Sequence, residues 1–136
     1  MWSGDYDGYT RHMETIATDH APKAIGPYSQ AIKANGLLYT SGQISLDPAT
    51  ASLVEGDFAA QARRVFLNLE AVLREAGTSF SKVVKATVYL TDLAHFQSLN
   101  AIYAEYFGDH KPARTTIGVK ELPKGSLVEI DLIALL

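Results

Sequence analysis

The stretch Lys111-Pro-Ala-Arg-Thr-Thr-Ile-Gly-Val119, taken with Leu127-Val-Glu-Ile-Asp131, places one arginine and one glutamate inside two predicted strands. A charge in a half-buried strand is costly unless it is paired or meets a ligand, so Arg114 and Glu129 form a candidate matched set. Arg114 offers several N–H donors in a planar fork that suits a carboxylate, and Glu129 offers a base. From local sequence alone, an ion pair in an interface is an equally good interpretation.

The last predicted strand, residues 127–135, has one apolar face and one mixed face. Because side chains alternate along a strand, the face that suits helices consists of Val128, Ile130, Leu132 and Ala134. The mixed face consists of Leu127, Glu129, Asp131, Ile133 and Leu135. By the same alternation Arg114, Thr116 and Gly118 share one face of the preceding strand, and the sequence leaves open whether the two strands are neighbours.

Two helices are predicted on the other side of these strands. Apolar residues recur at helical spacing over residues 58–76, where Asp57 is placed to cap the start and Gly77 to end the helix. A second helix is expected between Asp92 as cap and Gly108 as stop, with one apolar face that is rich in aromatic residues. No third helix is predicted to cover the mixed face. We therefore expect copies of the chain to pack sheet against sheet, with polar residues in the clefts between them.

The remaining strands are shorter. A candidate strand begins near Thr15, and Asn35-Gly36 lies between apolar segments in the manner of a tight hairpin. Residues 81–92 alternate and are rich in β-branched side chains, so they form a further strand. The order of strands and helices predicts an α+β sheet with both helices on one face.

Polar groups also lie in two loops and on the second helix. Gly26-Pro27 fixes a turn that presents Tyr28, and Ser41 with Gly42 ends a strand, where a glycine lets a backbone N–H approach a ligand. Asn100 lies at the edge of the apolar face of the second helix. Each of these groups also has a purely structural interpretation: Tyr28 lies in an ordinary turn, Gly42 simply ends a strand, and Asn100 is solvated.

Composition limits the classes of function. The chain has 136 residues and 47% hydrophobic content, which fit one domain, and its net charge of −3 argues against a nucleic-acid or membrane-surface footprint. It has no cysteine, which excludes disulfides and thiolate chemistry and favours the cytoplasm. The four histidines show no metal-ligand spacing, so no metal site is predicted. Residues 1–12 are expected to be a disordered extension, a native tail or a tag, outside a domain of residues 13–136.

An ordered set of short motifs runs from about Met13 to the C-terminus. It consists of Ile25-Gly-Pro-Tyr-Ser-Gln-Ala31, Ser41-Gly-Gln43, Asn68-Leu, Val72-Leu, Val84-Lys-Ala-Thr-Val-Tyr-Leu90, Asn100, Tyr103, Tyr106-Phe107, Pro112-Ala-Arg114, Leu122-Pro123 and Val128-Glu-Ile130. Together these motifs resemble the reactive intermediate deaminase A family, also called RidA or YjgF.

The resemblance implies a chorismate-mutase-like α+β fold with a mixed six-stranded sheet, a homotrimer built around the sheets, and sites between subunits. It implies hydrolysis of 2-iminobutanoate, 2-iminopropanoate and their enamine tautomers to 2-oxo acids and ammonia, without a cofactor. Carried over by position, Arg114 matches the residue that binds the substrate carboxylate, and Glu129 matches the residue that positions or activates water. The other matching pocket positions are Tyr28, Ser41, Gly42, Asn100 and Thr116. Many relatives have serine then cysteine after the arginine, whereas this chain has Thr115 and Thr116.

Two other functions stay open. The same family has members described as endoribonucleases or translation inhibitors, although an acidic chain with scattered histidines fits RNA cleavage poorly. A non-catalytic protein that binds small carboxylates, or one that acts like a chaperone, is the alternative from another class.

Overall fold

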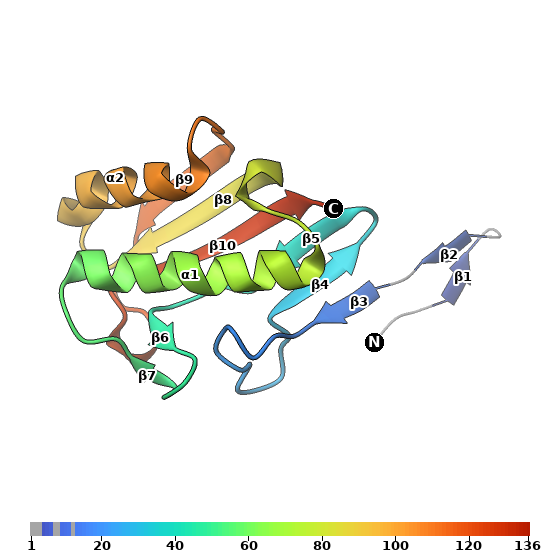
Figure 1. The fold of residues 1–136 in the computed structure, drawn as a ribbon, viewed down its shortest axis with the longest axis horizontal. Coiled ribbons are helices and arrows are strands. Elements are labelled where there is room, and N and C mark those ends of the chain that lie inside the picture. The colour runs from blue at the N-terminus through green and yellow to red at the C-terminus, as the bar shows by residue number, and fades with distance from the viewer. Residues whose placement is uncertain (1–3, 7–8, 12) are drawn as a thin grey trace.

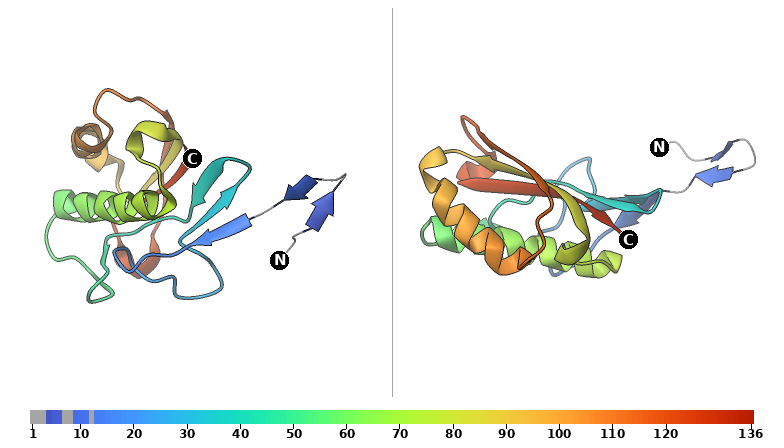
Figure 2. Two further views of the ribbon diagram at one scale, coloured as in Figure 1. Left: turned by 45° about the vertical axis from the view of Figure 1, so that its right-hand side comes forward. Right: turned by 90° about the horizontal axis from the view of Figure 1, so that it is seen from above.

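A six-stranded sheet with both α-helices of the described chain on one face forms the body of the protein (Figures 1 and 2). The computed structural model describes residues 4–6, 9–11 and 13–136. The strands of the sheet are β3 (Met13–Ile16), β4 (Ala31–Ala34), β5 (Leu37–Thr40), β8 (Val83–Leu90), β9 (Ala113–Gly118) and β10 (Val128–Leu135). The α+β class, the mixed sheet and the placement of both helices are as the sequence predicts.

The order of strands across the sheet is β3-β4-β5-β10-β8-β9. All neighbours are antiparallel except β8 and β9, which are parallel. The two strands that carry Arg114 and Glu129 are consecutive in the chain, yet β8 lies between them. Strand β9 therefore forms one edge of the sheet and β10 lies near its centre.

Helix α1 (Phe58–Ala76) has the bounds that the sequence predicts. The side chain of Asp57 accepts a hydrogen bond from the N–H of Ala60 at 3.0 Å, and Gly77 ends the helix. Helix α2 (Phe96–Phe107) starts later than expected. Asp92 accepts a bond from the N–H of Ala94 at 2.9 Å, so it caps a short 3₁₀ turn, Leu93–His95, that leads into α2.

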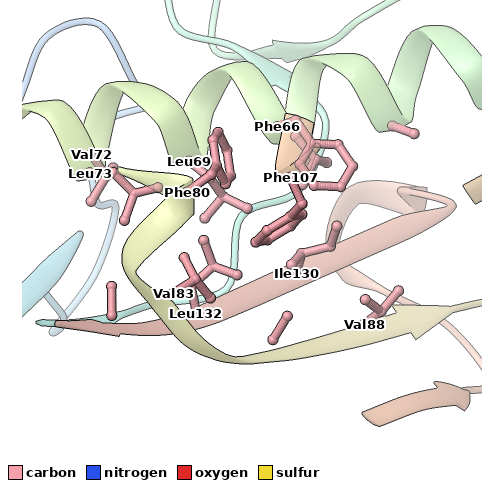
Figure 3. Close-up of a cluster of buried hydrophobic side chains, with 14 of the residues drawn as sticks. Phe66, Leu69, Val72, Leu73, Phe80, Val83, Val88, Phe107, Ile130 and Leu132 are labelled. Atoms are coloured by element: carbon pink, nitrogen blue, oxygen red, sulfur yellow. The ribbon is translucent and has the colours of Figure 1, made fainter. Parts of the chain in front are cut away.

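The core lies between α1 and the sheet (Figure 3). Phe66, Leu69, Val72 and Leu73 of α1 face Val88, Ile130 and Leu132 of the sheet, and Phe107 of α2 lies between Phe66 and Ile130. The apolar stripe of α1 and the even-numbered face of β10 are both almost fully buried, as the period of each element predicts. Each such side chain contributes about 1.5–3 kcal/mol on burial.

The hairpin between β4 and β5 is also as predicted. Asn35 has φ 53° and Gly36 has φ 79°, so both central residues of the turn are left-handed, as a two-residue turn of this kind requires. Asparagine and glycine are the residues that adopt this conformation at least cost.

The other elements are short. Two-stranded ribbons are formed by β1 (Gly4–Tyr6) with β2 (Tyr9–Arg11) and by β6 (Leu46–Asp47) with β7 (Ser52–Leu53), and 3₁₀ turns cover Phe80–Lys82 and Pro123–Gly125. The backbone of β1 and β2 is thus paired where the sequence predicts disorder; residues 1–3, 7–8 and 12 of that extension lie outside the described residues. In the described ranges, neither helix combines the length and the hydropathy that a membrane span requires.

Candidate functional site

Arg114 and Glu129 lie on opposite faces of the sheet. Arg114 is in register with Ala86 of β8, whereas Glu129 is in register with Tyr89 of the same strand. Partners in register point to the same face, and Ala86 is fully buried under the helices while Tyr89 is not. Within one chain the two side chains therefore do not meet, because β8 separates their strands. The sequence leaves this arrangement open, since alternation along consecutive strands does not say which strands are neighbours.

The Arg114 cluster consists of Phe96, Asn100, Tyr103, Arg114 and Thr116, and it lies on the helix face at the edge of the sheet. The guanidinium carbon of Arg114 lies 4.8 Å from the centre of the Tyr103 ring and 5.5 Å from that of Phe96. Thr116 is in register with Val88, so its side chain is on the same face as Arg114. Asn100 is one turn before Tyr103 on α2. The structure thus brings together three of the predicted site residues.

The polar atoms of this cluster have no protein partners. Arg114 makes no hydrogen bond or ion pair with any residue that the structure describes, whereas Arg63 on α1 pairs with Glu105 of α2. Three side-chain atoms, Asn100 Oδ1, Tyr103 OH and Thr116 Oγ1, are buried and unpaired within the same ranges. Buried polar groups without a partner are unfavourable, so this cluster is suited to receive a polar ligand or water.

Burial raises the pKa of Tyr103, and the positive charge of Arg114 opposes that rise. The net direction is upward, so the phenol is protonated at neutral pH. The cluster therefore carries one fixed positive charge, that of Arg114, and no negative charge. It is complementary to an anion.

The Glu129 cluster lies on the face of the sheet away from the helices. Tyr28, Ser41, Gly42 and Glu129 line one cavity of about 610 Å³, together with Lys23 and Lys124 and a set of apolar side chains. The structure thus brings the four remaining predicted site residues together. The same cavity is bounded by the loop before β4 and by the turn before β10.

Glu129 is held directly over Gly42. Reciprocal backbone hydrogen bonds between Gln43 and Ile130, at 2.9 and 3.2 Å, fix Gly42 beside β10. A Cβ atom at Gly42 would lie 2.8 Å from Cδ of Glu129 and would overlap its carboxylate oxygen. The sequence predicts that Gly42 gives a ligand access to the backbone; in the structure its missing side chain makes room for Glu129.

The acid groups of this face have perturbed pKa values. Burial, and then the charge of Asp131, raise the pKa of Glu129 above its ordinary 4.5. Burial also raises the pKa of Asp131, although hydrogen bonds, including one of 3.0 Å donated by the hydroxyl of Tyr89, oppose that rise. Glu129 accepts a proton more readily than an ordinary glutamate, which suits a group that takes and returns protons.

Sequence reasoning missed Phe96, Tyr103, Lys23 and Lys124 as members of these clusters. The aromatic pair was assigned to the core because it follows the helical period of α2. The spacing of Tyr103 three residues after Asn100 could have pointed to its place beside the site. Among the described residues, no three histidine, aspartate or glutamate side chains are grouped in a way that could hold a metal ion.

Comparison with known proteins shows close relatives over nearly the whole domain. The sequence model described as endoribonuclease L-PSP matches residues 18–136. The chain is 52% identical over 121 residues to a RutC family protein of Pyrococcus horikoshii, covering 89% of this chain and 96% of that protein. It is 45% identical over 120 residues to the 2-iminobutanoate/2-iminopropanoate deaminase of Homo sapiens, covering 88% of each.

Solved structures agree with the sequence comparison. The conserved Rid family protein YyfA of Yersinia pestis is similar with a TM-score of 0.90 and 50% identity, over 92% of this chain and all of that one. TdcF of E. coli, solved with bound serine, is similar with a TM-score of 0.86 and 37% identity, over 90% and 98% of the two chains.

Proposed function

Because the chain belongs to the RidA/YjgF family, whose sequence model is described as endoribonuclease L-PSP, we propose that it hydrolyses 2-imino acids and their enamine tautomers to 2-oxo acids and ammonia. The observation that carries the proposal is Arg114, a half-buried guanidinium with no acceptor among the described side chains. The name of the human relative supports the choice of 2-iminobutanoate and 2-iminopropanoate as substrates. Pyridoxal-phosphate enzymes form such imines from serine and threonine, and we place the reaction in the cytoplasm.

We place the site between copies of the chain in a homotrimer. Arg114, Asn100 and Thr116 of one copy would meet Glu129 of another, with Tyr28, Ser41 and Gly42 beside it. One chain cannot bring the two clusters to the same small molecule, because the sheet lies between them. The face that carries Glu129 also exposes large apolar side chains, including Tyr39 at 43% and Leu135 at 49%. Such a surface is suited to burial by a second copy.

Arg114 would hold the substrate. Its fork can form two parallel hydrogen bonds to a carboxylate, and such charge-assisted bonds are about twice as strong as neutral ones. Thr116 on the same strand and Asn100 on α2 add buried oxygen atoms that have no partner among the described residues. This grip fixes the position of the adjacent imine carbon.

Glu129 would direct the water. The oxygen of the water adds to the imine carbon while Glu129 takes one of its protons, and the C=N electron pair moves onto the already protonated nitrogen. Glu129 then returns its proton to that nitrogen. The C–N bond then breaks while the hydroxyl group gives its proton to the carboxylate of Glu129 and becomes the carbonyl group. The products are a 2-oxo acid and ammonia. General acid–base help of this kind contributes about 10²–10⁴-fold.

The first test is direct. Imines are generated in situ from threonine or serine by a pyridoxal-phosphate dehydratase, and 2-oxo acid release is followed with and without the protein. We expect faster release with the protein. Equal rates would remove the proposed activity.

The second test examines the location of the site. Arg114→Ala and Glu129→Gln are each expected to lose nearly all of their activity, but co-refolding them in equal amounts lets one copy supply the arginine and the other the glutamate. Random assembly then restores about a quarter of the wild-type activity per site, because each site needs one intact residue from each of two copies. Activity that stays at the level of the separate variants would show that the site does not form between copies.

A ribonuclease is the weaker alternative. The family description names that activity, but the chain carries a net charge of −3, which does not suit binding to a polyanion. RNA cleavage that weakens with salt and is lost in Arg114→Ala would favour it over imine hydrolysis.

A further inference from the structure

Arg114 is held by aromatic rings rather than by an acid. The rings of Tyr103 and Phe96 lie 4.8 and 5.5 Å from its guanidinium carbon, and no carboxylate of the described chain approaches it within ion-pair distance. We call Phe96 and Tyr103 the aromatic bracket. The two residues are seven positions apart on α2, so two helical turns place both on the side that faces β9.

An aromatic contact fixes a guanidinium without using its donors. An aspartate or glutamate partner would form hydrogen bonds to the same N–H groups that a substrate carboxylate needs. The face of a ring attracts the cation through its quadrupole, so the N–H groups stay available at the edge of the guanidinium. Arg63 illustrates the other case, since Glu105 occupies its donors.

Tyr103 is itself fixed by the core. Its ring stacks on Phe107 with centroids 4.3 Å apart, and it meets Phe66 edge to face at 6.0 Å. Phe66 and Phe107 are both buried. The core therefore fixes the ring of Tyr103, and that ring contacts the guanidinium. This contact restricts Arg114 on an edge strand, where a long side chain would otherwise sample many rotamers.

We propose that Tyr103 is a positioning residue for carboxylate binding, with Phe96 as the second wall of the aromatic bracket. Resting on the proposed function, this assigns to α2 a role in substrate affinity in addition to its role in the core. The ring of Tyr103 carries the effect through Arg114, and its hydroxyl is not required. The substrate class that suits this geometry is a small carboxylate, whose oxygen atoms accept hydrogen bonds from the free N–H groups of the guanidinium.

Three variants test the aromatic bracket. Tyr103→Leu removes the ring, Tyr103→Phe keeps it and removes only the hydroxyl, and Phe96→Leu removes the outer wall at a side chain that is already 39% exposed. Tyr106→Leu is the matched control, because Tyr106 lies on the same helix and stacks on Phe66 at 4.7 Å without meeting Arg114.

We expect Tyr103→Leu to raise KM for the imine, and Kd for the stable probe 2-oxobutanoate, by about tenfold, with kcat within about threefold. Phe96→Leu is expected to raise both by about threefold, and Tyr103→Phe by less than about twofold. Tyr106→Leu is expected to lower Tm without changing either constant. Unchanged KM and Kd in both folded Tyr103→Leu and Phe96→Leu would overturn the proposal. An effect of Tyr103→Phe as large as that of Tyr103→Leu would also overturn it, since the hydroxyl would then be responsible.

A readout without substrate separates this inference from the proposed activity. The Nε–H signal of Arg114 in a ¹H–¹⁵N spectrum is expected to be displaced by the ring currents of the aromatic bracket and to return toward ordinary arginine values in Tyr103→Leu. If the wild type fails to hydrolyse imines but shows this displacement and loses it in the variant, the proposed function falls and the aromatic bracket stands. If no displacement is seen in the wild type, the aromatic bracket falls whatever the activity.

Discussion

The Arg114 cluster and the Glu129 cluster occupy opposite faces of the same sheet, and their surroundings differ in kind. The first lies under α2, which supplies aromatic rings and unpaired oxygen atoms around a single positive charge. The second lies on the open face, where a glutamate rests on Gly42 in a cavity that its own chain leaves unfilled. Helix α2 packs beside the arginine, whereas no helix of the described chain covers the face that carries the glutamate.

Under the proposed function, this difference would keep substrate binding and proton transfer on separate faces of the fold. A cation and a carboxylate that met within one chain would neutralise each other and hold neither substrate nor water. On opposite faces, Arg114 keeps its donors free of any described acceptor, and burial and the charge of Asp131 keep the pKa of Glu129 raised. Assembly would then bring them within reach of one ligand.

The largest effect is expected from the arginine. Arg114→Ala removes two charge-assisted hydrogen bonds to the substrate and should lower kcat/KM by about 10³-fold. Tm should fall by only a few degrees, because within the described chain the side chain loses its contacts with two aromatic rings but no hydrogen bond or ion pair. Arg63→Ala is the matched control: it removes an exposed ion pair with Glu105, which solvent screens, so activity should not change. Unchanged turnover in folded Arg114→Ala would exclude the carboxylate-binding role.

The glutamate variant should lose activity without losing stability. Glu129→Gln removes the base and should lower kcat by about 10²-fold. Because folding raises the pKa of Glu129, the ionised form is less favourable in the folded state, and the neutral amide should leave Tm at pH 7 unchanged or higher. Thermal melts of the two proteins measure this. A lower Tm with full activity would mark Glu129 as structural.

The sequence predicts the elements and faces of this fold but not the order of its strands. Helix α1 follows from its period and from Asp57, and the two faces of β10 follow from alternation. The insertion of β8 between β9 and β10 depends on pairing between segments far apart in the chain, which no local pattern encodes. The relative placement of Arg114 and Glu129 could therefore not be derived.

For the candidate site, the sequence likewise predicts which residues take part but not how they are grouped. The seven residues taken from the family motifs fall into the two clusters, although their roles stay predictions. The helical period of α2 predicts that Tyr103 is buried, as it does for every aromatic residue on that face, but it does not predict which residues the ring contacts. Two residues of α2, Phe96 and Tyr103, lie beside Arg114 of the edge strand β9, so the Tyr103 ring contacts Arg114 as well as the core.

An intermediate effect is expected from Gly42. In Gly42→Ala the new methyl group displaces the carboxyl of Glu129, which should lower kcat by about tenfold while Tm changes by only a few degrees. Gly36→Ala should give the reverse, since its Cβ meets nothing within 4 Å but its φ of +79° is strained for alanine. That control should lose about 1 kcal/mol of stability and keep its activity. If both variants lose only stability, Glu129 does not need the space over Gly42.

The smallest effect concerns pH. As a base Glu129 must be ionised, so kcat/KM should fall as the pH drops through its pKa, and the midpoint of this acid limb should lie above 4.5 because burial and Asp131 both raise that pKa. Asp131→Asn removes the smaller of the two causes and should move the midpoint to lower pH by less than about one unit, with kcat at neutral pH nearly unchanged. The pH profile of kcat/KM for the two proteins measures the shift. A midpoint that moves upward, or an acid limb that persists in Glu129→Gln, would assign the titration to another group and leave the open face without its base.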